Sequence, residues 1–496
     1  MDLELKYLKL KEHFKNAKVI ESCAELIGWD ERTNMPPQGA DLRALQNSAL
    51  SKLHHDLVTE SWLGDALNEL ASESVNLPAD SDICVNVREW IRVFTRANKI
   101  PVTLVQEFSK TFVYSQQAWQ DARSQNNFVL FQPWLEKIID LKRHEAKCLA
   151  NGQVSYDALL DDYEPGATSL ELDSIFYPLK DTIIKALHSC SKENKRNLIL
   201  GNYPEQKQKI FSEIVAGYCG FDFNAGRLDT TAHPFCCGIG PGDCRITTRF
   251  NPADFSSGLF GVLHEAGHGL YEQGLDPDHF GLPTGTAVSL GIHESQSRLL
   301  ENQVGRSLEF WRFIYPLAIK FFPDQLSNIP LETFHKSINQ VRPGFIRVDA
   351  DEVTYNLHII FRYELEKDLL SQNLSVKDLP DAWKAKMKTY LDLVPDNDAT
   401  GCLQDIHWSA GLFGYFPTYL LGNLYAAQFI EKAKKVIGWN SNCLNLDVLS
   451  ELRQWLKKNI HLKGKRLLPG KLCENVTGEK LDKKYFEQYL MQKFNS

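Results

Sequence analysis

Residues 251–274 read NPADFSSGLFGVLHEAGHGLYEQG, and this stretch decides what the rest of the chain is built around. Asn, Asp and Ser side chains at its start can cap the free N–H groups of a helix. Apolar residues then recur at helical spacing, at Leu259, Val262, Leu263, Ala266 and Leu270. Gly274 is a favourable stop. The stretch therefore predicts a helix with one face packed against the core.

Within this predicted helix, His264 and His268 are the outer residues of an H-E-x-x-H motif. Residues four apart lie on the same face of a helix, so the two imidazoles point the same way, as two zinc ligands must. Glu265 lies on the same helix and can reach a metal-bound water without being a ligand itself. The motif predicts metal-assisted hydrolysis, with Glu265 as the catalytic base.

A catalytic zinc site usually has three protein ligands and one open position. Residues 274–291 are rich in Gly and Pro and predict a loop, and residues 291–302 predict a second helix. Glu294, 26 residues after His268, can return to the metal from that helix, and His293 is its rival. Neighbours on a helix point in different directions, so only one of the two binds. Glu294 is favoured because two His and one carboxylate suit peptide hydrolysis.

Composition excludes several classes of partner. The chain has 496 residues and a net charge of −8 with no basic block, which argues against nucleic acid and anionic membranes. It has no run of 18 apolar residues, and its first residues lack the pattern of a signal peptide. The 11 scattered cysteines fit reduced thiols. These features predict a cytoplasmic protein without a membrane segment.

The chain is predicted to be mostly α, a single domain over residues 1–496 with two helical lobes around a cleft. Helices are expected from Leu3 to the break at Pro36–Gly39, and then at 40–58, 103–124, 128–150, 169–192, 204–218 and 376–395. Strand-like residues occur at 228–233, 244–250 and 345–348. We expect a small sheet beside the zinc helix. Its edge could align an extended peptide substrate, or the strands could form an ordinary structural hairpin.

Peptide hydrolysis also needs donors for the oxyanion and, in a carboxypeptidase, a cation for the terminal carboxylate. The segments 401–408 and 414–419 are candidate sources of the donors, although aromatic stretches of this kind are more often core. Spacing alone does not choose among the candidate arginines, which are Arg245, Arg249, Arg298, Arg342 and Arg347.

Several ordered motifs together resemble the carboxypeptidase Taq family of zinc metallocarboxypeptidases. They are 233–235 (HPF), 243–247 (DCRIT), 264–268 followed by 293–296 (HESQ), 346–351 (IRVDAD) and 401–408 (GCLQDIHW), and 29–37 is also similar to the family's N-terminal region. The resemblance implies a large helical body with a long deep substrate groove, a small sheet beside the metal, and a homodimer. It also implies stepwise removal of residues from the free C-terminus of peptides, with zinc or cobalt as the metal.

By motif match, the resemblance implies that His264, His268 and Glu294 bind the metal and that Glu265 is the base. It assigns contacts with the substrate to a further set: Arg347, His233, Asp243, Arg245, Thr247, His407, Tyr415 and Tyr419. Within that set, Arg347 and residues 243–247 are expected near the substrate's C-terminal end, and His407 near the scissile bond.

Cys236 and Cys237 depart from the family's pattern, and Cys244 is close by in sequence. These thiols either make the enzyme sensitive to oxidation or to thiol-seeking metals, or are small packing residues, which is the favoured interpretation. The alternatives to a carboxypeptidase are a metallo-endopeptidase or dipeptidyl carboxypeptidase and, more remotely, a non-catalytic helical scaffold with a structural metal.

Overall fold

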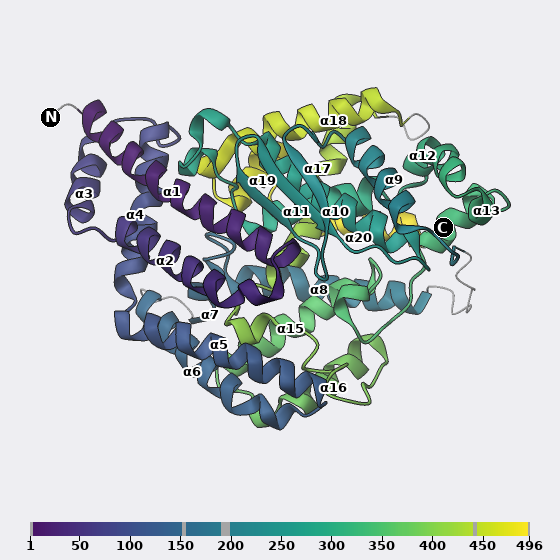
Figure 1. The fold of residues 1–496 in the computed structure, drawn as a ribbon, viewed down its shortest axis with the longest axis horizontal. Coiled ribbons are helices and arrows are strands. Elements are labelled where there is room, and N and C mark those ends of the chain that lie inside the picture. Colours follow the sequence, from purple (N-terminus) through teal and green to yellow (C-terminus); the bar gives the residue numbers. More distant parts are fainter. Residues whose placement is uncertain (1–2, 151–154, 190–198, 440–443, 495–496) are drawn as a thin grey trace.

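The computed structural model describes residues 3–150, 155–189, 199–439 and 444–494. Their fold is mostly α, as predicted, with one small sheet (Figure 1). The first half of the chain contributes α1 (Leu3–Thr33), α2 (Ala40–Val58), α3 (Leu63–Glu73), α4 (Asp82–Lys99), α5 (Val102–Ser124), α6 (Gln132–Leu149), α7 (Ser155–Leu160), α8 (Ser169–Ser189) and α9 (Glu205–Tyr218). The second half contributes α10 (Phe255–Gly274), α11 (Leu290–Arg298), α12 (Leu308–Phe321), α13 (Pro323–Leu326), α14 (Leu331–Ile338), α15 (Thr354–Leu370), α16 (Leu379–Leu391), α17 (Pro417–Ile437), α18 (Leu446–Asn459), α19 (Pro469–Thr477) and α20 (Lys484–Phe494).

Most of the predicted helix boundaries are confirmed to within a few residues. The break after α1 is a 3₁₀ turn at Pro37–Gly39. Helix α6 starts after a separate turn at Phe128–Leu130. Helix α16 ends at Leu391, before the predicted limit of 395, because Asp392 takes a left-handed conformation with φ of 55°. Residues 190–192 of the predicted helix 169–192 lie outside the described residues.

The sheet has three strands in the order β1-β3-β2, with β1 (Gly226–Thr230) parallel and β2 (Cys236–Gly240) antiparallel to β3 (Asp243–Thr248). It packs on the metal-site helix α10, as predicted, and α1 lies against the β2 edge (Figure 1). Strand β2 was not predicted. The strand predicted at 345–348 is wrong, since this segment leads into a 3₁₀ turn at Arg347–Asp349.

The helix predicted from residues 251–274 is α10. The Asp254 side chain accepts a hydrogen bond from Ser256 N at 2.9 Å and so caps its start. Its last residue, Gly274, has no side chain because a Cβ there would lie 2.2 Å from His461 Nδ1. Helix α11 is capped by Ser289 and continues as a π-helix over Leu299–Val304. Helices α10 and α11 cross closely, and α17 packs along α11 on another side.

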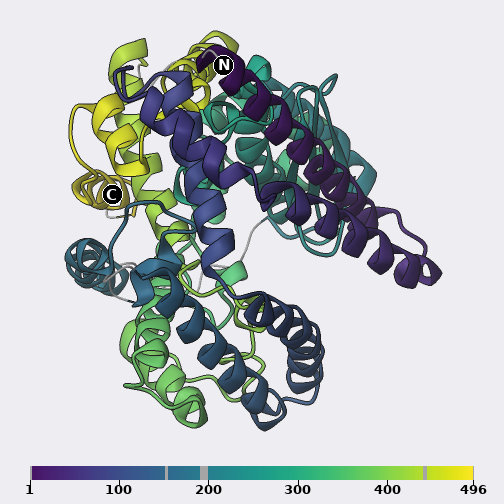
Figure 2. The same cartoon turned by 90° about the vertical axis from the view of Figure 1, so that its left-hand side faces the viewer.

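Buried side chains form two clusters. The larger one runs through the chain from Trp119 to Leu490, and the smaller one joins α1, α3 and α4 with Leu282. Figure 2 shows the hairpin of α1 and α2 along one side of the molecule, with its tip projecting outward, and α5 and α6 at the bottom of the view. Helix α20 brings Lys493 Nζ to within 2.6 Å of Glu352 Oε2. None of the helices described is long and apolar enough to cross a bilayer.

Candidate active site

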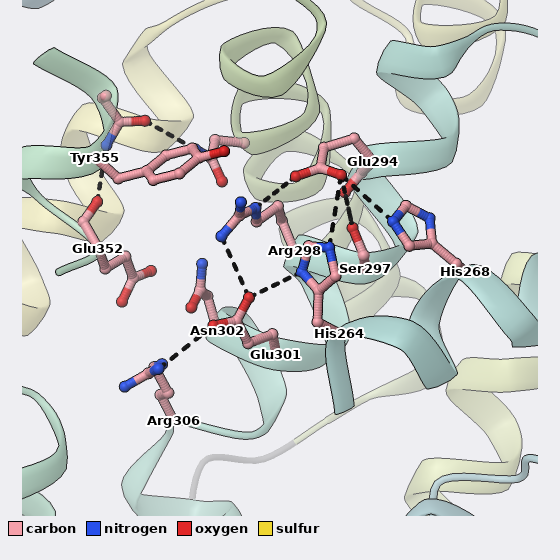
Figure 3. A network of polar contacts seen from close by, with 12 residues as sticks. His264, His268, Glu294, Ser297, Arg298, Glu301, Asn302, Arg306, Glu352 and Tyr355 are labelled. Atoms are coloured by element: carbon pink, nitrogen blue, oxygen red, sulfur yellow. Dashed lines mark hydrogen bonds and ion pairs between the residues drawn. The ribbon is translucent and has the colours of Figure 1, made fainter. Parts of the chain in front are cut away.

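The structure brings the three predicted metal ligands together. Donor atoms of His264, His268 and Glu294 all lie within 4.8 Å of one another, and they form the only such group of three or more His, Cys, Asp or Glu residues found in the described part of the chain. Glu294 Oε2 is 3.8 Å from His264 Nε2 and 3.4 Å from His268 Nε2 (Figure 3). Two imidazole nitrogens and a carboxylate oxygen suit a divalent cation such as zinc.

Glycines allow the helices that carry these ligands to approach each other. A Cβ at Gly267 would lie 2.4 Å from the Gln296 carbonyl oxygen on α11, so the residue directly before His268 has no room for a side chain. A Cβ at Gly422 on α17 would lie 2.4 Å from Glu294 Cγ. The third ligand therefore reaches the histidines through space that two glycines leave open.

Glu301 lies on the π-helix and holds the other side of His264 (Figure 3). Its Oε2 is 3.0 Å from His264 Nδ1 and accepts a hydrogen bond of 3.2 Å from Arg298. Arg306, in the turn that follows the π-helix, lies 3.3 Å from Glu301 Oε1. Burial opposes ionisation, but His264 and Arg298 lower the pKa of Glu301 to about 2.

Arg298 also holds Glu294. Its Nε donates to Glu294 Oε1 at 2.7 Å, which leaves Oε2 facing the histidines. Burial alone would raise the pKa of Glu294, but the Arg298 guanidinium and His264 hold it well below its usual range. Burial lowers the pKa of His268 to about 4. An ionised carboxylate and a neutral imidazole are the forms that bind metal.

His293, the rival ligand, contacts His268 instead. The two Nδ1 atoms are 2.6 Å apart, and His293 Nε2 is 2.7 Å from Glu272 Oε1. Glu265 is buried on the same helix as the two predicted histidine ligands, and burial raises its pKa to about 7. A carboxyl group with a pKa near neutrality can both accept and return a proton.

Arg347 is buried in a polar cluster, with the rings of Tyr355, Phe416 and Tyr419 around its guanidinium. Its Nε donates to Asp405 Oδ1 at 2.9 Å, and its Nη1 donates to Tyr355 OH at 3.2 Å. Arg362 donates to the other oxygen of Asp405 at 2.7 Å. Burial alone would raise the pKa of Asp405, but these two guanidiniums hold it well below its usual range. Two fixed cations around one anion leave this cluster with a net positive charge.

His407, Tyr415 and Tyr419 lie together beside this cluster. His407 Nε2 is 3.2 Å from Tyr419 OH, and the Tyr415 and Tyr419 rings meet edge to face at 5.4 Å. Burial and the positive Arg347 lower the pKa of His407 to about 3, so its ring is neutral. The Arg347 guanidinium lies 5.1 Å from the Tyr419 ring centroid.

The remaining predicted substrate residues, His233, Asp243, Arg245 and Thr247, lie on the sheet or next to it. His233 is exposed between β1 and β2. Asp243 pairs with Arg245, whose guanidinium lies over the Trp29 ring at 4.2 Å. Thr247 is fully buried and exchanges hydrogen bonds with the backbone of Phe235. Asp243, Arg245 and Thr247 therefore have contacts within the sheet or with α1, whereas His233 faces solvent.

The thiols of Cys237 and Cys244 are buried, and that of Cys236 is half-buried. Cys236 Sγ and Cys244 Sγ are 3.7 Å apart across β2 and β3, and Cys237 Sγ contacts the Glu25 carboxylate on α1 at 3.4 Å. The contact with Cys244 and burial raise the pKa of Cys236 well above its usual range, and burial raises that of Cys237 to about 12. Protonated thiols react poorly, which supports the packing interpretation.

Sequence reasoning missed the residues around the predicted ligands, namely Glu301, Gly422, Arg298 in its contact with Glu294, and Glu272 beyond His293. It also missed the pair of Asp405 and Arg362 that holds Arg347. Glu301 follows Glu294 by seven residues, a spacing that places both on one face of a helix, and this was the available signal. The contacts of Gly422 and Arg362 span distant parts of the chain and have no local signature.

A mostly helical fold with an H-E-x-x-H helix, and with a carboxylate from the next helix as the third donor, is typical of a metallopeptidase. The family model of carboxypeptidase Taq (M32) metallopeptidases matches residues 9–494, and the chain belongs to this family. It is therefore a metal-dependent carboxypeptidase, a peptide hydrolase.

Relatives match over their whole length. "Thermostable carboxypeptidase 1" of Thermus thermophilus is 42% identical over 100% of this chain and 99% of the relative, and "Carboxypeptidase 1" of Bacillus subtilis is 37% identical over 98% of each. Among solved structures, metallocarboxypeptidase 1 of Trypanosoma cruzi has a TM-score of 0.95 at 34% identity, with 100% of both chains covered. The M32 carboxypeptidase of Deinococcus radiodurans has a TM-score of 0.95 at 35% identity over 99% of both.

Proposed function

We propose that this carboxypeptidase removes single residues from the free C-terminus of peptides, with His264, His268 and Glu294 holding one divalent metal ion. The observation that carries the proposal is the convergence of these three donors within 4.8 Å. Zinc is our first choice because two imidazoles and one carboxylate are a common catalytic zinc set, and cobalt is the second choice. When bound, such an ion polarises the scissile carbonyl and makes a water acidic enough to attack at neutral pH.

Glu265 takes the proton of the attacking water and returns it to the leaving amine. Its burial and raised pKa support this role, because the carboxyl can hold the proton between the two steps. His407 and the Tyr415 and Tyr419 hydroxyls are our candidates for donors to the oxyanion, since they lie next to the Arg347 cluster.

Arg347 binds the terminal carboxylate of the substrate. Its guanidinium is held in place by Asp405 and Tyr355, so little conformational entropy is lost when a carboxylate docks. The net positive charge of the Arg347, Arg362 and Asp405 cluster favours an anion there. Asp243, Arg245 and Thr247 remain proposed contacts near the C-terminal end of the substrate, and His233 remains a proposed substrate contact.

The assignment of the base is tested with Glu265→Gln. This variant keeps the size and the hydrogen-bonding capacity of the side chain but cannot accept the water's proton. We expect metal content measured by elemental analysis to stay at one equivalent and kcat to fall at least about 10³-fold, within the range that acid–base catalysis contributes together with water positioning. Glu12→Gln on the exposed face of α1 is the matched control. Unchanged turnover in Glu265→Gln rejects Glu265 as the base.

The single-residue exopeptidase reaction is tested with a peptide and its C-terminally amidated twin. Products resolved by mass spectrometry should form a ladder of single residues from the free peptide, and the amide should be cut at least about 30-fold more slowly, since it lacks the charge that Arg347 binds. Equal cleavage of the amide would favour an endopeptidase, and release of dipeptides a dipeptidyl carboxypeptidase.

We also propose that the chain is one domain with two lobes around a substrate groove, that it forms a homodimer, and that it acts in the cytoplasm. The continuous main core from Trp119 to Leu490 supports a single domain. Exposed leucines on α2 (Leu42, Leu45 and Leu53) offer apolar area for a second copy. Light scattering on the purified protein distinguishes dimer from monomer. The free thiols of the described cysteines suit a reducing compartment.

A further inference from the structure

The two histidines of the metal centre are held by different groups. His264 Nδ1 faces a carboxylate directly, that of Glu301 at 3.0 Å. His268 Nδ1 instead faces a second imidazole, His293, at 2.6 Å, and only beyond it comes the Glu272 carboxylate at 2.7 Å. The carboxylate that supports His268 therefore acts across an intervening ring.

The proton positions in the series His268, His293 and Glu272 follow from which atoms donate and which accept. To bind a cation through Nε2, a neutral His268 must carry its proton on Nδ1, so Nδ1 of His293 has to accept. His293 then carries its own proton on Nε2, where it donates to the Glu272 carboxylate. The reverse arrangement would place a lone pair of His293 against that carboxylate and a proton on His268 Nε2. A doubly protonated His293 would also leave the proton on His268 Nε2.

His293 and Glu272 are both held in place by the surrounding structure. The His293 ring lies 5.1 Å from the Tyr271 ring at an interplanar angle of 35°, and the Tyr271 hydroxyl accepts a hydrogen bond from Val288 N at 3.1 Å. Strand β2 lies directly over Glu272, because a Cβ at Gly238 would come within 2.3 Å of Glu272 Oε2. This close packing leaves Glu272 little freedom to turn away from His293.

We propose that His293 and Glu272 are positioning residues which fix the tautomer and orientation of His268 for metal binding. They form a carboxylate–imidazole–imidazole relay, in which neither His293 nor Glu272 touches the metal or the substrate. The inference rests on the proposed ligand set of His264, His268 and Glu294. It adds a role for His293, which was the alternative to Glu294 as the third ligand, and for Glu272, which had no predicted role.

The relay is tested by metal affinity in the full-length protein, with zinc competed against a chelator and with the absorption spectrum of the cobalt-loaded protein. His293→Phe keeps a ring beside Tyr271 but cannot accept from His268, and we expect the zinc Kd to rise about 10–100-fold and the cobalt bands to shift. His293→Asn keeps an acceptor near the position of Nδ1, and Glu272→Gln keeps an acceptor for His293 without the charge. The zinc Kd of both variants should lie between those of wild type and His293→Phe.

His461→Phe is the matched control. His461 is another buried histidine whose ring lies 4.9 Å from that of Tyr271, but its Nε2 contacts Gln296 and not a metal ligand. We expect this variant to lose thermal stability and to keep the wild-type zinc Kd and cobalt spectrum. A comparable rise in its Kd would mean that packing around Tyr271, not the relay, controls affinity, and this would overturn the proposal.

The relay is also refuted if His293→Phe binds zinc within twofold of wild type with the same cobalt spectrum. Should His293→Phe fail to fold, wild-type affinity in both His293→Asn and Glu272→Gln refutes it equally. Failure of the proposed function would give a different result. The wild-type protein would then not bind one equivalent of zinc, or its zinc binding would not change when His264 and His268 are replaced.

Discussion

Arg347 shows how a single buried side chain can be prepared for a charged ligand. It has two fixed partners, Asp405 and Tyr355, and its guanidinium also lies near the Tyr419 ring. Burial disfavours a charged arginine, but the negative charge of Asp405 raises the pKa of Arg347 above its usual value. The guanidinium is thus permanently charged and already oriented.

For Arg347→Ala, we expect kcat/KM on a free peptide to fall by the equivalent of about 2–4 kcal/mol, because a charge-assisted pair with the terminal carboxylate is lost. Metal content should not change, since Arg347 has no contact with the ligands in the described structure. Steady-state kinetics and elemental analysis measure the two quantities. Arg249→Ala, at an exposed position, is the control and should keep wild-type kinetics.

A different outcome would argue against the clamp. If Arg347→Ala lost only thermal stability and kept its kcat/KM, Arg347 would be a structural partner of Asp405. The terminal carboxylate would then have to be bound elsewhere.

At the level of elements, the metal site depends on how closely α11 approaches α10 and α17. The two approaches are possible because Gly267 and Gly422 lack side chains where the backbones and Glu294 pass. Close-packed interiors tolerate added methyl groups poorly, so both positions constrain the geometry of the third ligand.

Gly422→Ala is expected to displace Glu294 and weaken metal binding. The added Cβ would lie 2.4 Å from Glu294 Cγ and 2.7 Å from its Cβ, which are contacts that a folded protein does not keep. Overpacking of this kind costs about 1–3 kcal/mol of stability, and we expect the zinc Kd to rise at least about tenfold as the carboxylate moves. Chelator competition and thermal unfolding measure the two effects.

Gly470→Ala on α19 serves as the control, because a Cβ there meets nothing within 4 Å. It should leave zinc affinity unchanged and raise stability slightly, since alanine is the better helix former. Wild-type zinc affinity in Gly422→Ala would show that Glu294 can relax without leaving the metal.

Local pattern predicted the elements that carry the metal ligands, but not the contacts between them. Helix α10 has a cap, a stop and an apolar face of its own, so 251–274 was sufficient to predict it. The π-helix at Leu299–Val304 has no local signal. Strand β2 contains two glycines, which do not favour strands, and it forms because β3 pairs with it.

The strand predicted at 345–348 was wrong for the opposite reason. Its Phe, Ile and Val have high strand propensity, but in the described structure it has no strand beside it. The Arg347 backbone N–H donates to the Gln404 side chain at 2.8 Å instead of to a neighbouring strand. Propensity describes what a segment can pair with, and tertiary contacts decide whether a partner exists.

At the level of the whole molecule, buried carboxyl groups join distant segments. Glu366 on α15 accepts hydrogen bonds from the Tyr156 hydroxyl at 2.9 Å, the Trp408 indole at 2.9 Å and the Gly414 amide at 3.0 Å. Burial raises the pKa of Glu366 to about 7 despite these donors. The folded protein therefore holds a proton at Glu366 that the unfolded chain releases near pH 4.5.

This difference predicts a dependence of stability on pH. Between pH 4.5 and 7 the folded state binds more protons than the unfolded state, so the contribution of Glu366 to the free energy of unfolding decreases as pH rises, by up to about 1.4 kcal/mol per pH unit. Below and above this window its contribution is constant. Glu366→Gln removes the titrating group, so the stability of wild type relative to this variant should fall across pH 4.5–7.

Thermal unfolding of both proteins at a series of pH values measures the effect, with Glu12→Gln as an exposed control. Parallel curves for wild type and Glu366→Gln would show that Glu366 has an ordinary acidity in the folded protein.

The contacts of α20 extend toward the metal-site region. Lys493 binds Glu352 and the Tyr489 hydroxyl, and Tyr489 in turn binds the carbonyl of Asn302 on the π-helix. The same π-helix carries Glu301, whose carboxylate faces His264. Unwinding of α20 would therefore remove a support of the segment that holds one of the proposed metal ligands.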